Sequence, residues 1–315
     1  MLNITTKSEQ QEHSDGNPLV YVVIPNFNGM SHLPYSLPSL FKSIYDNYRV
    51  VLVDNGSTDD SINYVAREYK DVLILKNKGK RGFAGGVNTG IRHALASGAD
   101  YIAVFSNDIK VHPEWLDLIL PEFAKDQDAG LVGFIEITRD KEELFYGSKI
   151  DINTITSHSV KGLAGCLYLC SAKAFKEVGV FDEDYYMYGE DNDLFYRFVE
   201  GGFKLIETNV PVWHYGEGSS QNNKLMPVWL AYRNALRFSI KNESFWRVMR
   251  MILSLTNQGC NPLLRRAVDN PNLRRLRRYN PVVNIVLIFG SCIWNLGNIG
   301  STLKARSLKY EFQTR

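Results

Sequence analysis

The chain has 315 residues, of which 44% are hydrophobic and 22% are charged, so it can form one large domain or two modest ones, and general disorder is excluded. Its formal net charge of +2 at pH 7 hides an asymmetry. Residues 241–315 contain thirteen Lys or Arg and three Asp or Glu, a net charge of +10 that leaves −8 on the first 240 residues. Two parts of opposite charge indicate two different roles.

A polar segment opens the chain. Residues 1–17 lack the basic start and apolar core of a signal peptide, so we expect a disordered tail on a cytoplasmic protein. The four cysteines are Cys166, Cys170, Cys260 and Cys292. Their spacing is not that of a metal site, and four are too few for a disulfide scaffold in this length, so we expect reduced thiols.

Apolar runs and helical patterns alternate between residues 19 and 106. The expected strands cover residues 19–25, 49–54, 71–76 and 100–106, and the expected helices cover residues 33–46, 59–69 and 84–97. Apolar, β-branched runs separated by helices predict a mainly parallel sheet with both faces covered. Ligands of such sheets lie beyond the carboxyl ends of the strands, where this sequence has the polar segments PNFNG, DNGSTD and SND.

Two segments after these strands have both a structural and a functional interpretation. Residues 55–59 are explained by a turn and a helix cap, but Asp54 is not, and a carboxylate there can accept the imide N–H of uracil or thymine. Residues 77–90 are rich in glycine yet match neither a dinucleotide-binding fingerprint nor a P-loop. Gly85 and Gly86 either permit close packing of a helix on the sheet, or let the backbone approach a nucleotide, or both.

Asp108 ends the SND segment, where a divalent cation that carries a diphosphate needs an oxygen ligand. A single aspartate is a weak signal. His214, in the segment WHYGEGSS, indicates by itself a hydrogen-bonded structural histidine. A metal site is indicated only if the fold brings His214 to Asp108.

The segment MYGEDNDLFYR, residues 187–197, concentrates acids where a helix begins. Advancing by about 100° per residue places Asp191 within an apolar stripe made of Leu194, Phe195 and Phe198. The same projection places Glu190, Asp193 and Arg197 on the opposite side, with Asp193 and Arg197 as a surface ion pair. An inward carboxylate at residue 191 is either a helix cap or a catalytic base.

Beyond residue 225 the pattern is helical and then basic, with arginine pairs at 265–266, 274–275 and 277–278. The apolar run 282–296 is interrupted by Asn284, Ser291 and Asn295 and is shorter than the ~20 residues of a membrane span. It is either a buried core helix or an amphipathic element that rests on anionic lipid.

In order and spacing, these segments resemble the family 2 inverting glycosyltransferases of GT-A fold. The resemblance rests on VVIPNFNG, VDNGSTD, NKGKRGFAGGVNTGI, FSNDI, residues 165–203 and WHYGEGSS, covers about residues 19–240, and is greatest to the rhamnosyltransferase-like branch that builds O-antigen and capsule glycans. It implies a Rossmann-like α/β fold with a mixed, mainly parallel sheet flanked by helices and a C-terminal helical extension. The implied domains are a GT-A domain at 18–225 and a basic helical region at 226–315.

The resemblance also implies roles for individual residues. Asp191 is the implied general base, and Asp108 and His214 are the implied ligands of Mg²⁺ or Mn²⁺. The implied donor-binding residues are Pro25, Phe27, Asn28, Asp54, Asn77, Gly82, Gly85, Asn88, Asn107 and Asp108. Two positions depart from the family pattern: Ser106 replaces the usual first acid or amide of the metal motif, and Val87 replaces a common arginine, whose diphosphate contact passes to Lys80 or Arg81.

The implied reaction transfers a sugar such as rhamnose from a dTDP or UDP donor to a hydroxyl of a glycan or lipid-linked acceptor, in polysaccharide synthesis. Such an enzyme is metal-dependent and is cytoplasmic or peripheral on the inner face of the membrane. We expect no nucleic-acid partner, because the N-terminal part is acidic and binding motifs are absent. The alternatives are an inactive sugar-binding relative and a sugar nucleotidyltransferase, although the latter requires a Gly-rich basic loop where this chain has PNFNG.

Overall fold

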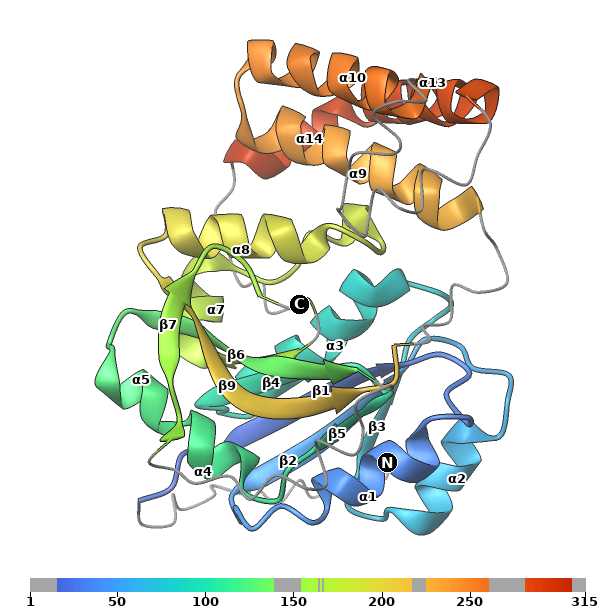
Figure 1. Ribbon diagram of the computed structural model, residues 1–315. Coiled ribbons are helices and arrows are strands. Elements are labelled where there is room, and N and C mark those ends of the chain that lie inside the picture. Colours follow the sequence, from blue (N-terminus) through green and yellow to red (C-terminus); the bar gives the residue numbers. More distant parts are fainter. Residues whose placement is uncertain are drawn as a thin grey trace, which may run out of the picture.

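The computed structural model describes residues 16–138, 154–163, 165, 167–216, 225–260 and 281–307. It consists of a nine-stranded sheet with helices on both faces and a layer of C-terminal helices at one end (Figure 1). The expected disordered tail lies outside the described residues except for Gly16 and Asn17, and so do the arginine pairs between residues 265 and 278.

The first half of the sheet confirms the predicted parallel arrangement. Strands β1 (Val20–Asn26), β2 (Tyr48–Asp54), β3 (Leu73–Lys76) and β4 (Tyr101–Phe105) are parallel, in the order β3-β2-β1-β4. Helices α1 (Leu33–Leu40), α2 (Ser61–Glu68) and α3 (Gly82–Ala96) connect them. Helix α1 ends six residues before the prediction because Tyr45 turns into the core and donates a hydrogen bond to the Pro18 carbonyl at 2.5 Å.

The second half of the sheet is mixed. Strand β8 (Leu167–Ser171) is antiparallel to β4, and β6 (Ala129–Thr138), β9 (Lys204–His214) and β5 (Ile109–Val111) follow, with β7 (Ser157–Val160) paired to β9. The accompanying helical elements are α4 (Trp115–Ile119), α5 (Pro121–Lys125), α7 (Ala172–Val178), η3 (Glu183–Tyr185) and α8 (Glu190–Glu200). The predicted α/β class with a flanked sheet is therefore confirmed.

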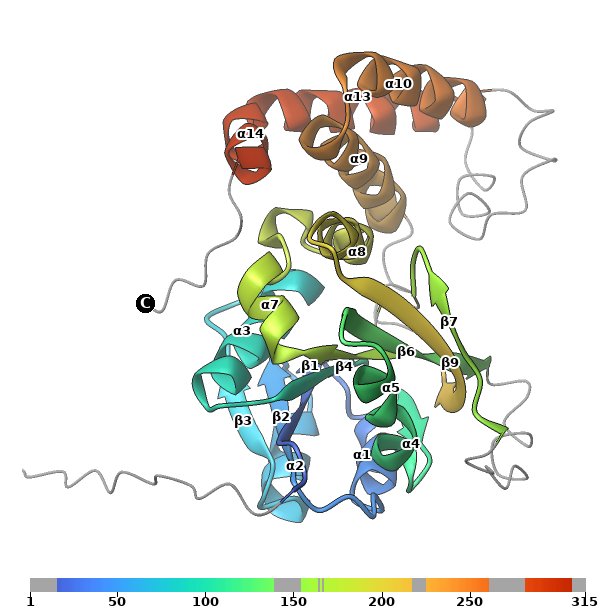
Figure 2. The same ribbon diagram turned by 90° about the vertical axis from the view of Figure 1, so that its left-hand side faces the viewer.

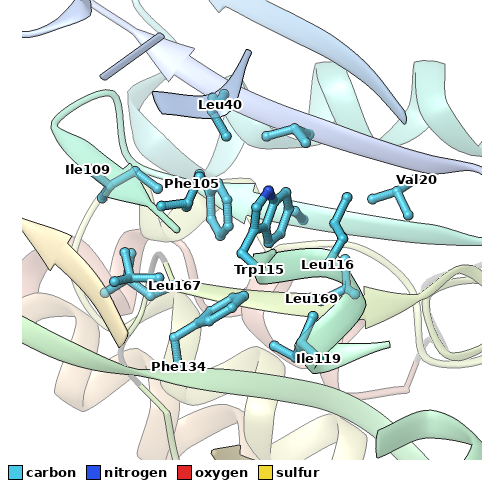
Figure 3. Close-up of a cluster of buried hydrophobic side chains, with 14 of the residues drawn as sticks. Val20, Leu40, Phe105, Ile109, Trp115, Leu116, Ile119, Phe134, Leu167 and Leu169 are labelled. Carbon is cyan, nitrogen blue, oxygen red and sulfur yellow. The ribbon is translucent and has the colours of Figure 1, made fainter. Parts of the chain in front are cut away.

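Two apolar cores hold the layers together, one on each face of the sheet. Alternate residues of β1 divide between them, so that Val20 and Val22 face one core and Val23 faces the other. Figure 3 shows the first core, in which Trp115 packs between Phe105 and Phe134 with ring centroids 5.0 and 5.9 Å away. The two cores hold the strands in place and thereby position the polar residues at the carboxyl ends of the strands.

Four helices form the C-terminal region: α9 (Leu225–Asn242), α10 (Phe245–Cys260), α13 (Pro281–Gly297) and α14 (Ile299–Ser307). Figure 2 shows α9 directly above α8, with α10 and α13 farther from the sheet. Among the described helices, none is by itself both long and apolar enough to cross a membrane, and α13 with α14, bent by 67°, meets that test only as a pair. The division into domains at residue 225 stays a prediction.

Helix α8 corrects the predicted exposure of Asp193. Leu194, Phe195 and Phe198 are buried as predicted, but Asp193 is also buried, with 0% of its surface exposed. The Lys241 ammonium of α9 lies 2.9 Å from the Asp193 carboxylate, and Arg197 pairs with it at 2.9 Å. The helical projection failed here because α9 covers the face that it assigned to solvent.

The buried charges form a cluster between α8, α9 and the segment before η3. Asp182 accepts hydrogen bonds from Arg237 at 2.9 Å and from Lys241 at 3.1 Å, and all three side chains are buried. Removing one member of such a cluster leaves buried charge of the opposite sign without compensation. The cluster therefore stabilises the packing of α9 on α8 and on the segment before η3, and the loss of one charged member is expected to weaken this packing.

We expect Lys241→Met to lower the free energy of unfolding by about 3 kcal/mol, because Asp182 and Asp193 then lose a shared buried cation. Urea unfolding followed by tryptophan fluorescence measures the change. Lys42→Met, at an exposed lysine, is the matched control and is expected to change it by less than about 0.5 kcal/mol. Equal effects of the two substitutions would contradict a cohesive role for the cluster.

Candidate active site

The carboxyl ends of β1, β2 and β3 bring the predicted donor-binding residues together. In register, Asn26 pairs with Asp54, and Asp54 pairs with Lys76, so the loops that follow start side by side. The backbone N–H of Asn55 donates to the Asn26 carbonyl at 2.8 Å, and that of Asn77 donates to the Asp54 carbonyl at 2.9 Å. The structure therefore places residues 25–28, Asp54 and Asn77 along one edge of the sheet.

Asn26, which the sequence analysis did not single out, connects three of these loops. Its amide donates to the hydroxyls of Ser57 at 3.2 Å and Ser61 at 3.1 Å, and its Oδ1 accepts from the Asn107 amide at 2.8 Å. The available signal was an amide residue at the end of a buried strand, where a side chain that makes three hydrogen bonds is needed. Asn107 is thereby held at the same edge as Asp54.

Asp54 is nearly buried, and its Oδ1 accepts a hydrogen bond from the Ser57 N–H at 2.9 Å. The N-cap of α2 is Asp60, which makes no side-chain cap bond, and the preceding Asp59 accepts from the Ser61 N–H through its Oδ1 at 3.2 Å. Asn28 adopts a positive φ of 52° and its Oδ1 accepts from the Thr58 N–H at 2.7 Å. The predicted cap at residues 57–59 is therefore wrong by one residue, and the Asp54 carboxylate remains a separate feature.

The exposed end of this edge carries an aromatic ring and a basic side chain. Pro25 and Phe27 are partly exposed, and the Lys80 ammonium lies 4.4 Å from the centroid of the Phe27 ring. Arg81 instead pairs with Glu183 at 2.5 Å. Of the two candidates for the diphosphate contact, Arg81 is therefore held in an ion pair, whereas Lys80 lies over the ring of Phe27.

Three predicted donor-binding positions in helix α3 make close internal contacts. Asn88 is fully buried, donates to the Phe181 carbonyl at 2.9 Å and accepts from the Phe181 N–H at 3.0 Å, so it joins α3 to the chain before η3. Gly82, with a φ of 68°, lies against Tyr186, and Gly85 lies against Arg81. Close packing therefore excludes a side chain at these glycines, and the contact of all three residues with a donor stays a prediction.

Asp108 and His214 meet at the next part of the same edge. Ile109 pairs with His214 across β5 and β9, which places His214 Nε2 3.2 Å from Asp108 Oδ1. The other ring nitrogen, Nδ1, lies 2.7 Å from Glu136 Oε1, and Ser106 donates to Asp108. Glu136 was missed by sequence reasoning, and its signal was a lone carboxylate in the apolar strand segment GLVGFIEIT.

The two carboxylates shift the titration of this histidine. Burial by itself lowers the pKa of His214, but the hydrogen bonds to Asp108 and Glu136 outweigh it and raise the pKa to about 9. Burial likewise opposes ionisation of Asp108, and the hydrogen bonds and charge from His214 reverse that effect and lower its pKa below the ordinary value. The imidazole thus lies between two negatively charged carboxylates.

These donors fit a divalent cation. Asp108 offers a buried carboxylate, and a histidine oriented through its second nitrogen by a carboxylate is the usual arrangement of a metal-binding imidazole. Oxygen and nitrogen donors suit Mg²⁺ or Mn²⁺. Within the described ranges no three His, Cys, Asp or Glu side chains gather around one point.

Asp191 reaches this edge through β8. Because β8 is antiparallel to β4, Leu167 at its start pairs with Phe105, the last residue of β4, which is three residues before Asp108. Gly165 lies just ahead of that pair, and a Cβ added to it would clash with Asp191 Oδ2. The carboxylates of residues 108 and 191 therefore lie at the same end of the sheet.

The Asp191 carboxyl serves the helix and remains at the site. Its Oδ1 accepts a hydrogen bond from the Asn192 N–H at 2.8 Å in the first turn of α8, but Gly189 is the N-cap of this helix and no side chain caps it, so the N-cap interpretation of Asp191 is wrong. Burial raises the pKa of Asp191, and burial followed by the charge of Asp191 raises the pKa of Glu190 to about 8. Burial thus makes both carboxyl groups harder to ionise than in water.

The segment before α8 has an unusual backbone that α9 holds in place. Tyr186 and Tyr188 have positive φ angles of 63° and 71°, which cost free energy in residues other than glycine. The Asn234 amide donates to the carbonyls of Tyr185 at 3.0 Å, Met187 at 2.9 Å and Tyr188 at 2.6 Å. A C-terminal helix therefore positions the segment that carries Asp191.

The fold is the GT-A fold of glycosyltransferases. Mannosyltransferase PcManGT from Pyrobaculum calidifontis, solved with GDP-Man and Mn²⁺, superposes with a TM-score of 0.57 at 17% identity over 94% of this chain and 88% of its own. GalNAc-T7, solved with UDP, GalNAc and Mn²⁺, gives a TM-score of 0.57 at 14% identity over 92% of this chain and 58% of its own. At these identities the likeness shows the fold alone.

The model of the family described as glycosyl transferase family 2 matches residues 21–178, half of the chain, and the chain belongs to that family. An N-acetylglucosaminyl-diphospho-decaprenol L-rhamnosyltransferase of Mycobacterium tuberculosis is 25% identical over 295 residues, 82% of this chain and 95% of that protein. An uncharacterized glycosyltransferase of Rickettsia typhi is 25% identical over 195 residues, 58% of this chain and 59% of that protein. The chain thus spans less than two thirds of the Rickettsia protein and of GalNAc-T7.

Proposed function

We propose that this glycosyltransferase moves a sugar from a nucleoside diphosphate to an acceptor hydroxyl with inversion at the anomeric carbon. One observation carries the proposal: Asp54, the pair of Asp108 with His214, and Asp191 all lie at the carboxyl end of one sheet. A nucleobase near Asp54, a diphosphate near Asp108 and His214, and an acceptor near Asp191 would then bind along a single edge of the sheet.

In the proposed reaction, Asp191 accepts the proton of an acceptor hydroxyl as that oxygen bonds to the anomeric carbon. The bond between that carbon and the diphosphate oxygen breaks, and the nucleoside diphosphate leaves with the electron pair. Asp108 and His214 would hold Mg²⁺ or Mn²⁺, which neutralises negative charge on a diphosphate. Lys80, beside Phe27, adds a positive charge near the donor.

The finer assignments follow likeness and chemistry. The Asp54 carboxylate suits the imide N–H of thymine or uracil, so we propose a dTDP or UDP donor. The printed activity of the mycobacterial relative supports L-rhamnose as the sugar and a lipid-linked acceptor. The enzyme would then act in the synthesis of a cell-surface polysaccharide such as O-antigen, at the cytoplasmic face of the membrane.

The base specificity can be tested by isothermal titration of dTDP, UDP and GDP in MnCl₂. We expect the two pyrimidine nucleotides to bind at least about tenfold more tightly than GDP, because a hydrogen bond to a charged group contributes ~1.5–3 kcal/mol. Asp54→Asn keeps the acceptor for the Ser57 N–H but removes the charge and presents an amide, so the preference is expected to disappear.

The matched control is Asp46→Asn, at an exposed carboxylate away from this edge. If GDP binds most tightly, or if Asp54→Asn keeps the preference for pyrimidine nucleotides, the proposed recognition of the nucleobase by Asp54 is contradicted. Transfer from dTDP-L-rhamnose to a polyprenyl-diphosphate sugar separates an active enzyme from an inactive relative, since the relative binds the nucleotide without forming product.

A further inference from the structure

Helix α13 is built with its polar side inward. The face packed against the protein carries Asn284, Ser291 and Asn295, each with at most 2% of its surface exposed, and Ile288 as the apolar exception. Its outer face carries Ile285, Val286, Phe289, Ile293 and Leu296. Phe289 is 67% exposed and Leu296 71%, the reverse of what a helix in water requires.

The inward polar groups hold α13 to α9. The Asn295 amide donates to the Arg233 carbonyl at 2.9 Å, and the Ser291 hydroxyl contacts the Leu287 carbonyl at 2.7 Å and the Trp229 carbonyl at 3.5 Å. Helices surrounded by lipid associate in this way, through small and polar residues, because their apolar residues already face an apolar medium. The run from Pro281 to Gly297 also contains no charged residue.

Helix α10 extends the same surface. It contacts α13 and lies beside it at the end of the molecule farthest from the sheet (Figure 1). Phe245, Trp246, Met249 and Leu253 are exposed on it, and Trp246 is 73% exposed. Arg250 is exposed at the edge of this apolar stripe, and Trp with Arg is the composition of the interface between lipid tails and head groups.

We propose that the outer face of α10 and α13 docks on the surface of an anionic lipid bilayer. At 17 residues, α13 is about 26 Å long, shorter than the ~30 Å of a hydrocarbon core, which suits a helix that lies along the surface. The net charge of +10 on residues 241–315 is complementary to anionic head groups. Arg247 and Arg250, both exposed on α10, contribute to this charge.

Helix α9 connects the docking face to the segment that carries Asp191. Helix α9 touches α13 on one side and, through Asn234, the segment that carries Asp191 on the other. An acceptor carried by a lipid would therefore be met by an enzyme already oriented on the same membrane. This orientation needs no contact between the lipid and the residues of the active site.

Flotation of the full chain with vesicles tests the proposal, using phosphatidylcholine alone and an equimolar mixture with phosphatidylglycerol. We expect binding to the mixture, a loss of about tenfold or more in Ile285→Glu/Phe289→Glu, and a loss of about fivefold in Arg250→Gln with the mixture only. Ile44→Glu/Leu73→Glu, at exposed apolar residues far from this face, adds the same charge and is expected to bind like the wild type.

Circular dichroism and nucleotide binding verify that each variant is folded. Two results would overturn the proposal: vesicle binding that the double glutamate variant retains, or a wild-type chain that ignores both vesicles. If light scattering instead shows a dimer that this variant dissociates, the occupant is a second copy. Lipid binding is measured without turnover, so its failure leaves the proposed reaction untouched.

Discussion

Asp191→Asn should lower turnover by at least about 10²- to 10⁴-fold while leaving the affinity for nucleoside diphosphate unchanged, because the amide retains the shape of the side chain but cannot accept a proton. Stopped assays of product formation give turnover, and isothermal titration gives the affinity. Glu200→Gln, at an exposed carboxylate at the end of the same helix, is the matched control and is expected to keep full activity.

Gly165→Ala is expected to move the Asp191 carboxyl group without changing its chemical identity. The added Cβ must displace the Asp191 carboxyl, so we expect a fall in kcat with the affinity for nucleotide retained. Gly98→Ala, at a glycine whose Cβ would meet open space, controls for the substitution itself, although its φ of 81° adds some strain. Wild-type kcat in both Asp191→Asn and Gly165→Ala would remove Asp191 from the role of base.

The pH dependence has a defined sign. Burial raises the pKa of Asp191 above its ordinary value, and the proposed base acts only when deprotonated. As the pH is lowered, activity is therefore expected to fall at a pH above the ordinary pKa range of an aspartate. The residual activity of Asp191→Asn is expected to lack this acidic decrease.

Asp108→Asn should abolish the dependence of nucleotide binding on Mn²⁺. Asn keeps an acceptor for the Ser106 hydroxyl but removes the charge that would hold the cation beside His214. We expect the affinity of the variant for dTDP or UDP in MnCl₂ to equal that of the wild type in EDTA, and turnover to be lost in both cases.

Glu136→Gln is expected to weaken the binding of the metal without abolishing it. Glu136 accepts from the far nitrogen of His214 without occupying the cation position, and such orienting partners typically contribute 10- to 100-fold in metal affinity, roughly. Glu207→Gln, at an exposed carboxylate on β9, is the control and is expected to leave metal affinity unchanged. Full activity of the wild type in excess EDTA would contradict the assignment of the metal.

The periodicity of the sequence was sufficient for the parallel half of the sheet and for the edge on which the site lies. Strand ends such as Asp54 and Asp108 could be placed because parallel strands bring their carboxyl ends together. The wheel of α8 also placed Leu194 and Phe198 correctly. These features depend on local patterns of about ten residues, which a single sequence contains in full.

What failed depended on contacts between distant segments. Asp193 was assigned to solvent because nothing near it in sequence reveals Lys241, which lies on another helix. The contact of Asn88 with the Phe181 backbone was missed because the two residues are 93 positions apart, and the assignment of Asn88 to the donor stays a prediction. The buried-helix interpretation of residues 282–296 was wrong for a different reason: Asn284, Ser291 and Asn295 were treated as interruptions of an apolar core, whereas they form the inner face of α13.

The central claim is that Asp108 and Asp191 face one cleft that holds the donor. The most direct measurement is the anomalous scattering of Mn²⁺ in crystals grown with dTDP or UDP. The account predicts a single strong peak at Asp108 and His214, with the diphosphate between the ion and Asp191. A peak elsewhere, or solid protein between the ion and Asp191, would contradict it.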